Sequence, residues 1–365
     1  MATEASVAPA DEGSGDLQEF GYQQELKRRL GGFQMFAISF AFISVAVGIF
    51  GTYGQVLQSG GPFGIWIWVA AAIGQILVAL VMAQFAARIP LSGSSYQWAS
   101  RLANPKIGWG FGWLSYAYLG IGVVAVNNAL ASQAFMPLFG IAPDEGTARL
   151  ITIALLVVQA VLVVLSTRIV AVLNSSAVVL ELAIVVALVI ALFVAVAVSG
   201  DGSLDNLTSR GAAEGASDYF ALTGPFALSI IVGLATLVGF DAAANLAEEA
   251  KDPFRTVPRA IVGSVVAAAL LGMVFLIALT VTIPDIPSIS QSASPVADIM
   301  RLQLGSVAEK GLLVVITFAF FAAGMVTMAT GARLVYAMAR DSRFPAHRLM
   351  RKVDPRTQTP IPARS

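Results

Sequence analysis

Two carboxylates, Glu181 and Asp241, stand within apolar stretches that are long enough to be membrane spans. A charge in the middle of a membrane costs roughly a few kcal/mol, so ionisable residues there are rare and mark substrate or ion pathways. A buried carboxyl group can take up a proton instead of staying charged, so either residue suits proton coupling. The alternative for each is a carboxyl group that hydrogen-bonds a neighbouring helix and contributes only to packing.

Two segments are rich in glycine: SVAVGIFG over residues 44–51 and GFD over residues 239–241. Small residues in membrane helices also serve close helix packing. Interrupted helices at corresponding positions of two repeats nevertheless indicate a transport site, because each break exposes amide groups on one side and carbonyls on the other. We therefore predict that Gly48 and Gly239 lie at non-helical breaks facing one central cavity, where a substrate with a carboxylate and an ammonium group can bind.

A third group of charges, Glu248 and Glu249 with Arg259, follows the second glycine segment. Paired carboxylates can perform acid–base chemistry. Adjacent residues on a helix point about 100° apart, however, so these two carboxylates do not converge on one substrate. The pattern favours a salt-bridged inner gate or a loop anchor over an active site.

The composition indicates the class of protein in which these residues lie. Of 365 residues, 57% are hydrophobic and 12% charged, and the mean hydropathy is +0.79; soluble domains have about 45–50% apolar and about 25% charged residues. No Asp, Glu, Lys or Arg occurs between Arg29 and Arg88, or over 107–143, and a membrane helix needs about 20 apolar residues. The sequence therefore predicts an all-α polytopic membrane protein and excludes a soluble enzyme, a disordered chain and a secreted disulfide scaffold.

The absence of certain residues bounds the chemistry. There is no cysteine, the single histidine is His347 in a basic stretch, and the net charge is zero. We therefore expect no metal site, no cofactor and no nucleic-acid partner. No Ser/His or Cys/His arrangement supports an enzyme.

The sequence predicts three regions: a disordered cytosolic tail over residues 1–30, a transmembrane permease domain over 31–345 and a basic cytosolic tail over 346–365. The permease domain contains eight predicted spans. Of the 22 lysines and arginines, 18 fall on the side of the predicted loops that faces the cytosol if the N-terminus is inside. Both termini are then cytosolic. The spans run over 33–57, 63–87, 107–135, 149–166, 169–198, 219–247, 258–283 and 311–339.

Five segments resemble the amino acid–polyamine–organocation permease superfamily, and most closely its amino acid/choline transporter branch. They are FAISFAFISVAVGIFGTYG (36–54), SGGP (59–62), RIPLSGSSYQWAS (88–100), GFDAAANLAEEAKDPFRTVPRAI (239–261) and GARLVYAMARDSRFP (331–345). Together with their spacing they cover nearly all of residues 31–362. The resemblance implies a LeuT-like inverted-repeat transporter fold, in which helices 1 and 6 unwind at the substrate site.

The resemblance also implies roles for individual residues. Substrate contacts would come from Ser44, Ala46, Val47, Gly48 and Ile49 at the carboxylate end, and from Ala235, Gly239, Phe240 and Asp241 at the ammonium end and the side-chain pocket. In some relatives a lysine of the fifth helix fills a sodium position, and the matching place here is Glu181. Thr327 and Thr330 on the eighth helix could ligate sodium instead, although threonines that only pack between helices are commoner.

Relatives of this kind usually continue beyond the eighth span, so the resemblance implies a complete first repeat and an incomplete second one. We expect a truncated permease, or one completed by an oligomer or by another polypeptide. The predicted function is secondary active transport of amino acids or related amines by alternating access across a bacterial inner membrane, with proton coupling. A non-transporting scaffold or sensor derived from a permease and a sodium-coupled permease are the alternatives, and amino acids, GABA, choline and polyamines all remain possible substrates.

Overall fold

Long apolar helices dominate the structure, a computed structural model that describes residues 20–22, 25–142, 144–165, 167–292 and 294–353. Within these residues, seven helical segments are long and apolar enough to cross a membrane. They confirm the prediction of an all-α polytopic membrane protein. The segments are Gly32–Ser59, Pro62–Arg88, Pro105–Leu138, Glu145–Val164, Val170–Ser199, Pro253–Val281 and Ser306–Arg340.

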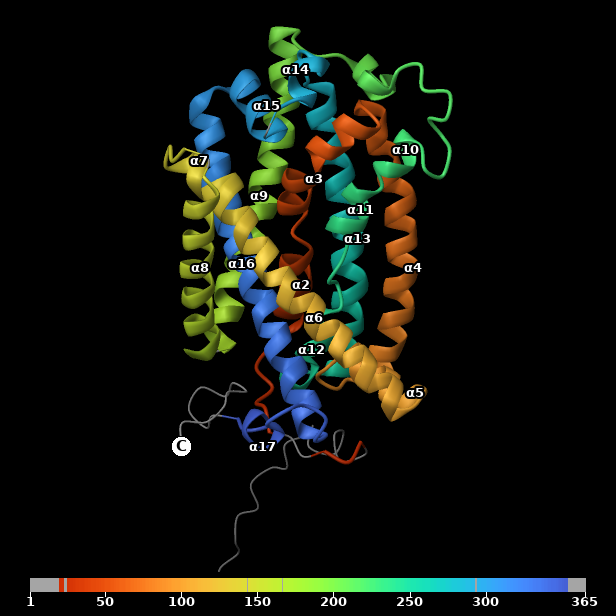
Figure 1. Cartoon of the computed structure of the whole chain (residues 1–365), viewed down its shortest axis with the longest axis vertical. Helices are drawn as coiled ribbons and strands as arrows, with labels where there is room; N and C mark the ends of the chain where they lie inside the picture. Colours follow the sequence, from red (N-terminus) through yellow and green to blue (C-terminus); the bar gives the residue numbers. More distant parts are fainter. Residues whose placement is uncertain (1–19, 23–24, 143, 166, 293, 354–365) are drawn as a thin grey trace, which may run out of the picture.

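The predicted span over 219–247 is not a continuous helix. It consists of α10 (Pro225–Leu228), α11 (Ile231–Thr236), α12 (Ala242–Asn245) and the 3-10 turn η5 (Ala247–Glu249). These pieces follow one another down the bundle (Figure 1): α11 packs against α3 and α4, and α12 packs against α2, α13 and α16. The eight expected spans are therefore seven long helical segments and one series of short helices.

The first span is also interrupted, and its two halves occupy the centre of the bundle. The halves are α2 (Gly32–Ile43) and α3 (Val45–Ser59). Helix α2 packs against α9, α13 and α16, and α3 packs against α11. Figure 1 shows the two red halves stacked with the break at mid-height. Both interrupted segments thus lie next to each other inside the bundle.

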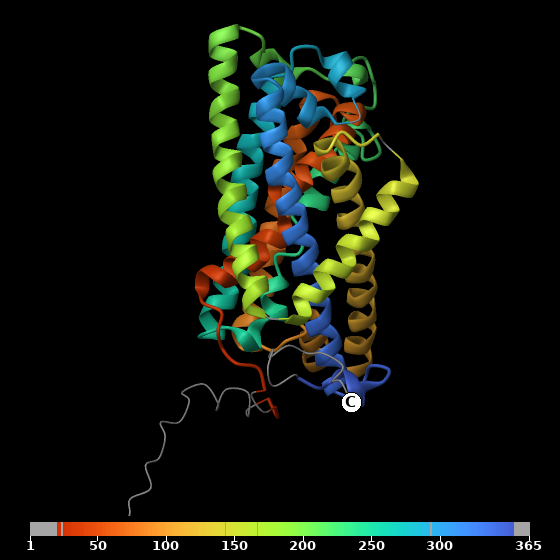
Figure 2. The ribbon, with the colours of Figure 1, turned by 90° about the vertical axis from the view of Figure 1, so that its left-hand side faces the viewer.

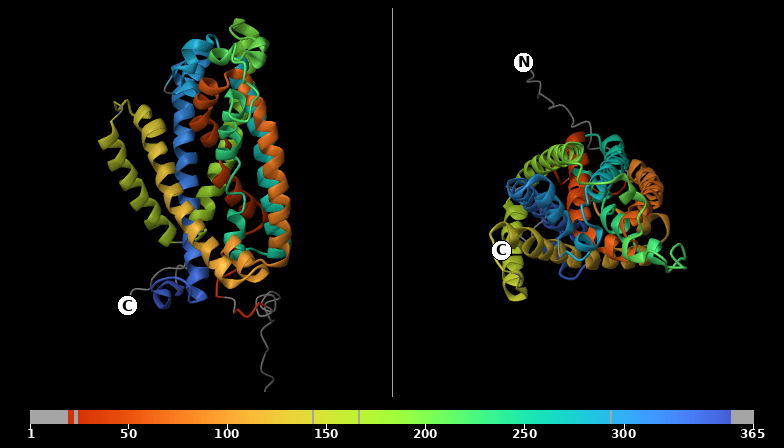
Figure 3. Two further views of the ribbon diagram at one scale, coloured as in Figure 1. Left: turned by 45° about the vertical axis from the view of Figure 1, so that its right-hand side comes forward. Right: turned by 90° about the horizontal axis from the view of Figure 1, so that it is seen from above.

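The remaining elements surround these two segments. They are η1 (Pro62–Trp66), α4 (Ile67–Arg88), α5 (Ser95–Leu102), α6 (Pro105–Ala129), the π-turn η2 (Leu130–Phe135), α7 (Met136–Leu138), α8 (Glu145–Leu165), α9 (Thr167–Ser199), η3 (Leu204–Thr208), η4 (Gly211–Ala213), α13 (Pro253–Val281), α14 (Ile286–Ser290), α15 (Pro295–Leu304), α16 (Ser306–Arg340) and α17 (His347–Met350). Helix α6 crosses the bundle diagonally in front of α16 (Figure 1), and α8 stands obliquely at its edge (Figures 2 and 3).

Side-chain burial separates the core from an apolar outer surface. Phe40 and Tyr53 of the first span are fully buried, whereas Leu114, Ile121 and Leu150 on α6 and α8 are more than two-thirds exposed. Apolar residues facing outward are expected where lipid, not water, surrounds a helix. Helices α4 and α13 approach closely, and the Trp68 indole donates to the carbonyl of Ala269 at 2.9 Å.

The described chain begins and ends at the same end of the bundle, here called the terminal end (Figure 1). Of the predicted tail over 1–30, residues 1–19, 23 and 24 lie outside the described residues. In its described part, Leu26 and Leu30 are only 1% and 2% exposed. The backbone of Leu30 pairs with Ala250, so this part of the tail packs against the bundle.

Candidate functional site

The break in the first span lies at Ser44, which has a left-handed backbone conformation with φ 39° and ψ 86°. Helix α3 starts anew after it, so the first amide groups of α3 have no partner within the helix. One carboxylate oxygen of Glu181 accepts hydrogen bonds from the amide of Ala46 at 2.9 Å and from the Ser44 hydroxyl at 3.1 Å. A helix N-terminus favours negative charge. The break is therefore a carboxylate site, and a side chain of the protein occupies it.

Glu181 reaches this position from α9, where its side chain is 1% exposed. It lies at mid-helix in a run of apolar residues, as the sequence predicted. The sequence did not show that its partner is the first-span break. The structure thus joins two features that were predicted separately, a buried carboxylate and an interrupted helix.

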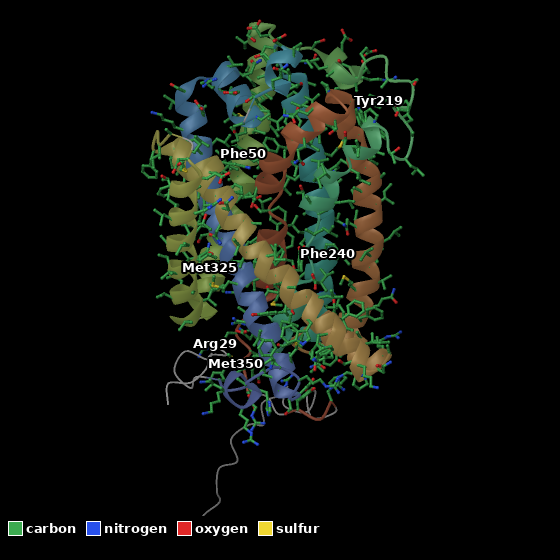
Figure 4. All side chains as sticks on the ribbon, viewed as in Figure 1. Arg29, Phe50, Tyr219, Phe240, Met325 and Met350 are labelled. Carbon is green, nitrogen blue, oxygen red and sulfur yellow. The ribbon has the colours of Figure 1, made fainter. Side chains whose placement is uncertain are left out.

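The break in the sixth segment spans Leu237 to Asp241, between α11 and α12. Gly239 has a φ of 81°, and a Cβ there would lie 1.8 Å from the Phe42 ring. A positive φ and a close neighbour both require glycine. The prediction of a break at Gly239 is confirmed, and Phe240 beside it is 4% exposed. Figure 4 shows Phe240 at mid-height of the bundle.

Ser39, which sequence reasoning missed, connects the two interrupted segments. Its hydroxyl donates to the carbonyl of Phe240 at 2.7 Å and accepts from the amide of Ala243 at 3.2 Å. It therefore pairs one backbone group within the sixth-segment break and one in the first turn of α12. The only signal in the sequence is a lone serine in an apolar run, whose buried hydroxyl requires a partner.

Gly48 does not lie at a break, contrary to the prediction. It belongs to the first turn of α3, and its amide donates to the carbonyl of Ser44 at 2.9 Å. A Cβ on Gly48 would lie 2.4 Å from two side-chain atoms of Thr236. Glycine is needed at this position because α11 packs directly against it, and Ser44 supplies the backbone conformation of the break.

The other expected substrate contacts are distributed around these two breaks. Ala46 and Ile49 are buried, Val47 is partly buried, and Ala235 on α11 is exposed. Asp241 ends the sixth-segment break, and one of its carboxylate oxygens accepts a hydrogen bond from the Ser94 hydroxyl at 2.9 Å. Asp241 thus faces the loop before α5, on the terminal side of the break.

The two threonines of α16 that were predicted to ligate sodium, Thr327 and Thr330, lie in different surroundings. The Thr327 hydroxyl donates to the carbonyl of Ala323 at 2.8 Å, and its side chain lines an apolar groove of about 310 Å³ between α6 and α16. Thr330 lines a separate small cavity that also contains Asp241. The structure therefore separates the two residues that were expected to share a sodium site.

Two ion pairs, one fully buried and one partly buried, lie at the terminal end. The carboxylate of Glu248 pairs with both terminal nitrogens of Arg340, at 2.8 and 2.9 Å, and Glu249 pairs with Nε of Arg333 at 2.9 Å. Glu248 and Glu249, the carboxylates predicted for an inner gate, both form ion pairs, and their described ion-pair partners are arginines of α16. Arg259 is exposed on α13.

The segment before α2 adds to this closure. The hydroxyl groups of Tyr22 and Tyr96 donate to the two carboxylate oxygens of Asp341, at 2.6 and 2.7 Å. Burial raises the pKa of both phenols, so they stay protonated and can donate. The Tyr22 ring also lies 3.8 Å from the Arg340 guanidinium carbon, a cation–π contact. We call Glu248, Glu249, Arg333, Arg340 and Asp341 the terminal-end lock.

Two interrupted helices, a buried carboxylate on one break and a locked end are features of a transporter, and comparison with known proteins agrees. A family model described as amino acid permease matches residues 30–364. The chain belongs to the amino acid permease family. This membership confirms the resemblance to the amino acid–polyamine–organocation superfamily.

Several proteins that are similar to this chain are named as permeases. It is 28% identical over 401 residues to the amino-acid permease BAT1 of Arabidopsis thaliana, covering 98% of this chain and 73% of that protein. It is 27% identical to the BAT1 homolog of rice, of which it covers 72%. It is 28% identical over 362 residues to the GABA-specific permease of Saccharomyces cerevisiae, covering 94% of this chain and 62% of the yeast protein.

Proposed function

We propose that this permease is a secondary active transporter that carries an amino acid or a related amine by alternating access around the two breaks, coupled to protons. The membrane is the cytoplasmic membrane of a bacterium and both termini are cytosolic. This orientation rests on the bias of lysine and arginine toward the loops on one side. The terminal-end lock is then the inner gate.

A single observation carries the proposal: the Glu181 carboxylate occupies the amide of Ala46 and the hydroxyl of Ser44. These are the groups that a substrate carboxylate needs at this helix N-terminus. Two carboxylates cannot both be charged in one buried site without strong repulsion. Substrate binding therefore requires Glu181 either to leave or to take up a proton, and the second course couples a proton to each substrate.

The lock supplies the second requirement of alternating access. Its ion pairs join η5, the last element of the sixth interrupted segment, to α16. Opening toward the terminal end must break or displace them. In our proposal the state described here is closed at that end, and movement of the interrupted segment separates Glu248 and Glu249 from their arginines.

The substrate class follows from the two poles of the site and from the relatives. A carboxylate pole at Ala46 and an acidic side chain at Asp241 suit a molecule with one carboxylate and one ammonium group. The yeast relative is named for GABA, which has both, and the plant relatives are named for amino acids. We place amino acids, ω-amino acids included, ahead of choline and polyamines.

Uptake into proteoliposomes tests the proposal. The purified permease is reconstituted, and uptake of a radiolabelled amino acid set that includes GABA is measured with and without an inward proton gradient. Glu181→Gln keeps the shape and a hydrogen-bond acceptor for Ala46 but cannot exchange a proton, so its uptake should lose most of its dependence on the gradient. Glu145→Gln is the control, because this side chain is 86% exposed.

The possible results of the uptake experiment distinguish between the alternative functions. Uptake that follows a sodium gradient and ignores the proton gradient would identify a sodium-coupled permease. Specific substrate binding with no uptake would favour a scaffold or sensor. Proton-driven uptake that is unchanged in Glu181→Gln would refute the role of this residue.

A further inference from the structure

An open hollow lies at the terminal end, where α6 begins and α16 ends. Its volume is about 1010 Å³, and Lys106, Trp109 and Arg343 are among the residues that line it. Lys106 belongs to the first turn of α6, and Arg343 lies just after the last residue of α16. The Arg343 guanidinium donates a hydrogen bond to the carbonyl of Pro105, so the two segments are joined here. The hollow therefore carries two positive charges from parts of the chain that are far apart in sequence.

These two cations have no carboxylate partner. Within the part of the chain that the structure describes, none of the ion pairs involves Lys106 or Arg343. The stretch from Leu26 to Pro143 contains no Asp or Glu, so α4, α5 and α6 bring no acidic residue to this end. Lysine and arginine are the side chains that hold phosphate groups in proteins. The hollow is therefore suited to an anion, and to a phosphate in particular.

An aromatic cluster connects the hollow to an apolar groove. Trp109, which lines the hollow, meets Trp113 edge-on with ring centroids 6.2 Å apart, and Trp113 meets Tyr116 at 5.6 Å. Phe344, which follows α16, stacks on Trp113 at 5.3 Å. Tryptophan and tyrosine are enriched where a membrane meets water. The cluster therefore marks the level of the lipid headgroups, and the two cations of the hollow lie beside it.

The groove beyond the cluster is mainly apolar and lies between α6 and α16. Its volume is about 310 Å³, and its walls include Tyr116, Gly120 and Val123 of α6, Gly331 and Val335 of α16, and Met350 of α17. Trp109 and Tyr116 are seven residues apart and Gly120 follows four later, so hollow, cluster and groove share one face of α6. Tyr116 lies about 15 Å along α6 from Lys106, which is the depth of half the hydrocarbon core of a membrane. An acyl chain whose headgroup lies at Lys106 would therefore reach the groove.

We propose that the hollow and the groove together bind one anionic phospholipid from the leaflet at the terminal end. Its phosphate lies between Lys106 and Arg343, and one acyl chain passes the aromatic cluster and lies in the groove between α6 and α16. Charge selects this lipid, because a zwitterionic headgroup would bring an ammonium group next to two cations. The groove selects a lipid over a free phosphate ion. The proposal is independent of the transported substrate and of the coupling ion.

Thermal stability of the purified permease in an uncharged detergent tests the site. Phosphatidylglycerol and phosphatidylcholine with the same acyl chains are titrated separately, and inorganic phosphate serves as the free anion. A ligand that binds only the folded state raises the melting temperature in a saturable manner. We expect phosphatidylglycerol to act at a roughly tenfold or more lower concentration than phosphatidylcholine, and this preference to shrink at high salt, which screens exposed charges. Native mass spectrometry of the same samples should show one phosphatidylglycerol retained by each chain.

Matched variants locate the lipid. Lys106→Gln and Arg343→Gln should each weaken the apparent affinity for phosphatidylglycerol by about fivefold and leave the affinity for phosphatidylcholine unchanged. Lys310→Gln is the control, because Lys310 is exposed near the opposite end of α16. Gly120→Leu should fill part of the groove and weaken the binding of phosphatidylglycerol. A Cβ on Gly120 meets nothing within 4 Å, and the same holds for Gly74 on α4, so Gly74→Leu is the control for this variant.

Any of four outcomes would overturn the proposal. Phosphatidylglycerol and phosphatidylcholine bind with the same affinity, Lys106→Gln binds phosphatidylglycerol as Lys310→Gln does, Gly120→Leu binds it as Gly74→Leu does, or inorganic phosphate alone stabilises the permease as much as the lipid. If Arg343→Gln does not fold, because it also loses the hydrogen bond to Pro105, Lys106→Gln decides alone. Uptake has no part in these measurements, so a failure of the proposed function would leave their result unchanged.

Discussion

Replacing Gly48 by alanine should destabilise the permease by forcing α3 and α11 apart at the site. An added Cβ would lie 2.4 Å from Cγ2 and Oγ1 of Thr236 and 2.7 Å from its Cβ. Carbon atoms pack at about 3.5–4.0 Å, so one of the two helices must shift by about 1 Å. The short Thr236 side chain cannot rotate away from the added Cβ, because it is packed in the core and only 1% exposed.

The sign follows from two opposing effects. Alanine in place of glycine favours a helix interior by about 0.5–1 kcal/mol. Overpacking of a well-packed core costs about 1–3 kcal/mol. With three atoms inside contact distance the packing cost should dominate, so we expect a net loss of about 1–2 kcal/mol and a melting temperature lower by a few degrees.

A second-site change identifies the cause. Thr236→Ala removes the two nearest atoms and also an unpaired buried hydroxyl, so alone it should be close to neutral. Combined with Gly48→Ala it should restore part of the lost stability, and Thr236→Gly should relieve the remaining clash. Gly74→Ala is the control, because its added Cβ meets nothing within 4 Å. Thermal denaturation in detergent measures all of them. If Gly48→Ala is as stable as Gly74→Ala, or if no change at Thr236 rescues it, the close approach of α3 and α11 is wrong.

Two further predictions concern other buried contacts. Removing one partner of the Glu249–Arg333 pair, whose side chains are 4% and 1% exposed, should cost about 3–5 kcal/mol, since the remaining buried charge loses this ion pair. The double variant Glu249→Gln/Arg333→Met should be more stable than either single variant in the same denaturation assay; additive losses would contradict a direct pair. Ser39→Ala should cost about 1–3 kcal/mol because it leaves the Phe240 carbonyl and the Ala243 amide unpaired. A stability loss no larger than that of Ser306→Ala, at the exposed first residue of α16, would show that Ser39 does not connect the two segments.

The long spans and the sixth-segment break could be predicted because each has a local cause. A run without charged residues must be in lipid or in a core, and its length then requires a helix. The break at Gly239 could be predicted because its backbone needs glycine. The same reasoning placed the first break at Gly48 and was wrong by four positions, since the residue that leaves the helical region is Ser44. Gly48 is instead required by a close contact between two helices. The sequence alone does not show whether a glycine is needed for its backbone conformation or for close packing.

Partners across the bundle could not be predicted, because they depend on how helices are rotated and displaced relative to each other. Arg259 is near Glu248 and Glu249 in sequence, and sequence proximity made it the expected partner. Arg333 and Arg340 lie two helical turns apart on α16, so they share one face, and that face meets η5.

The same limit explains Glu181. Its burial was visible in the sequence, but its acceptor role at Ala46 depends on α9 packing against α2 beside the break. A carboxylate at that point pairs an amide at the start of α3 that has no partner within the helix. An exposed helix N-terminus inside a membrane would be costly, and Glu181 covers it; in the function proposed above, a substrate carboxylate would take the place of Glu181.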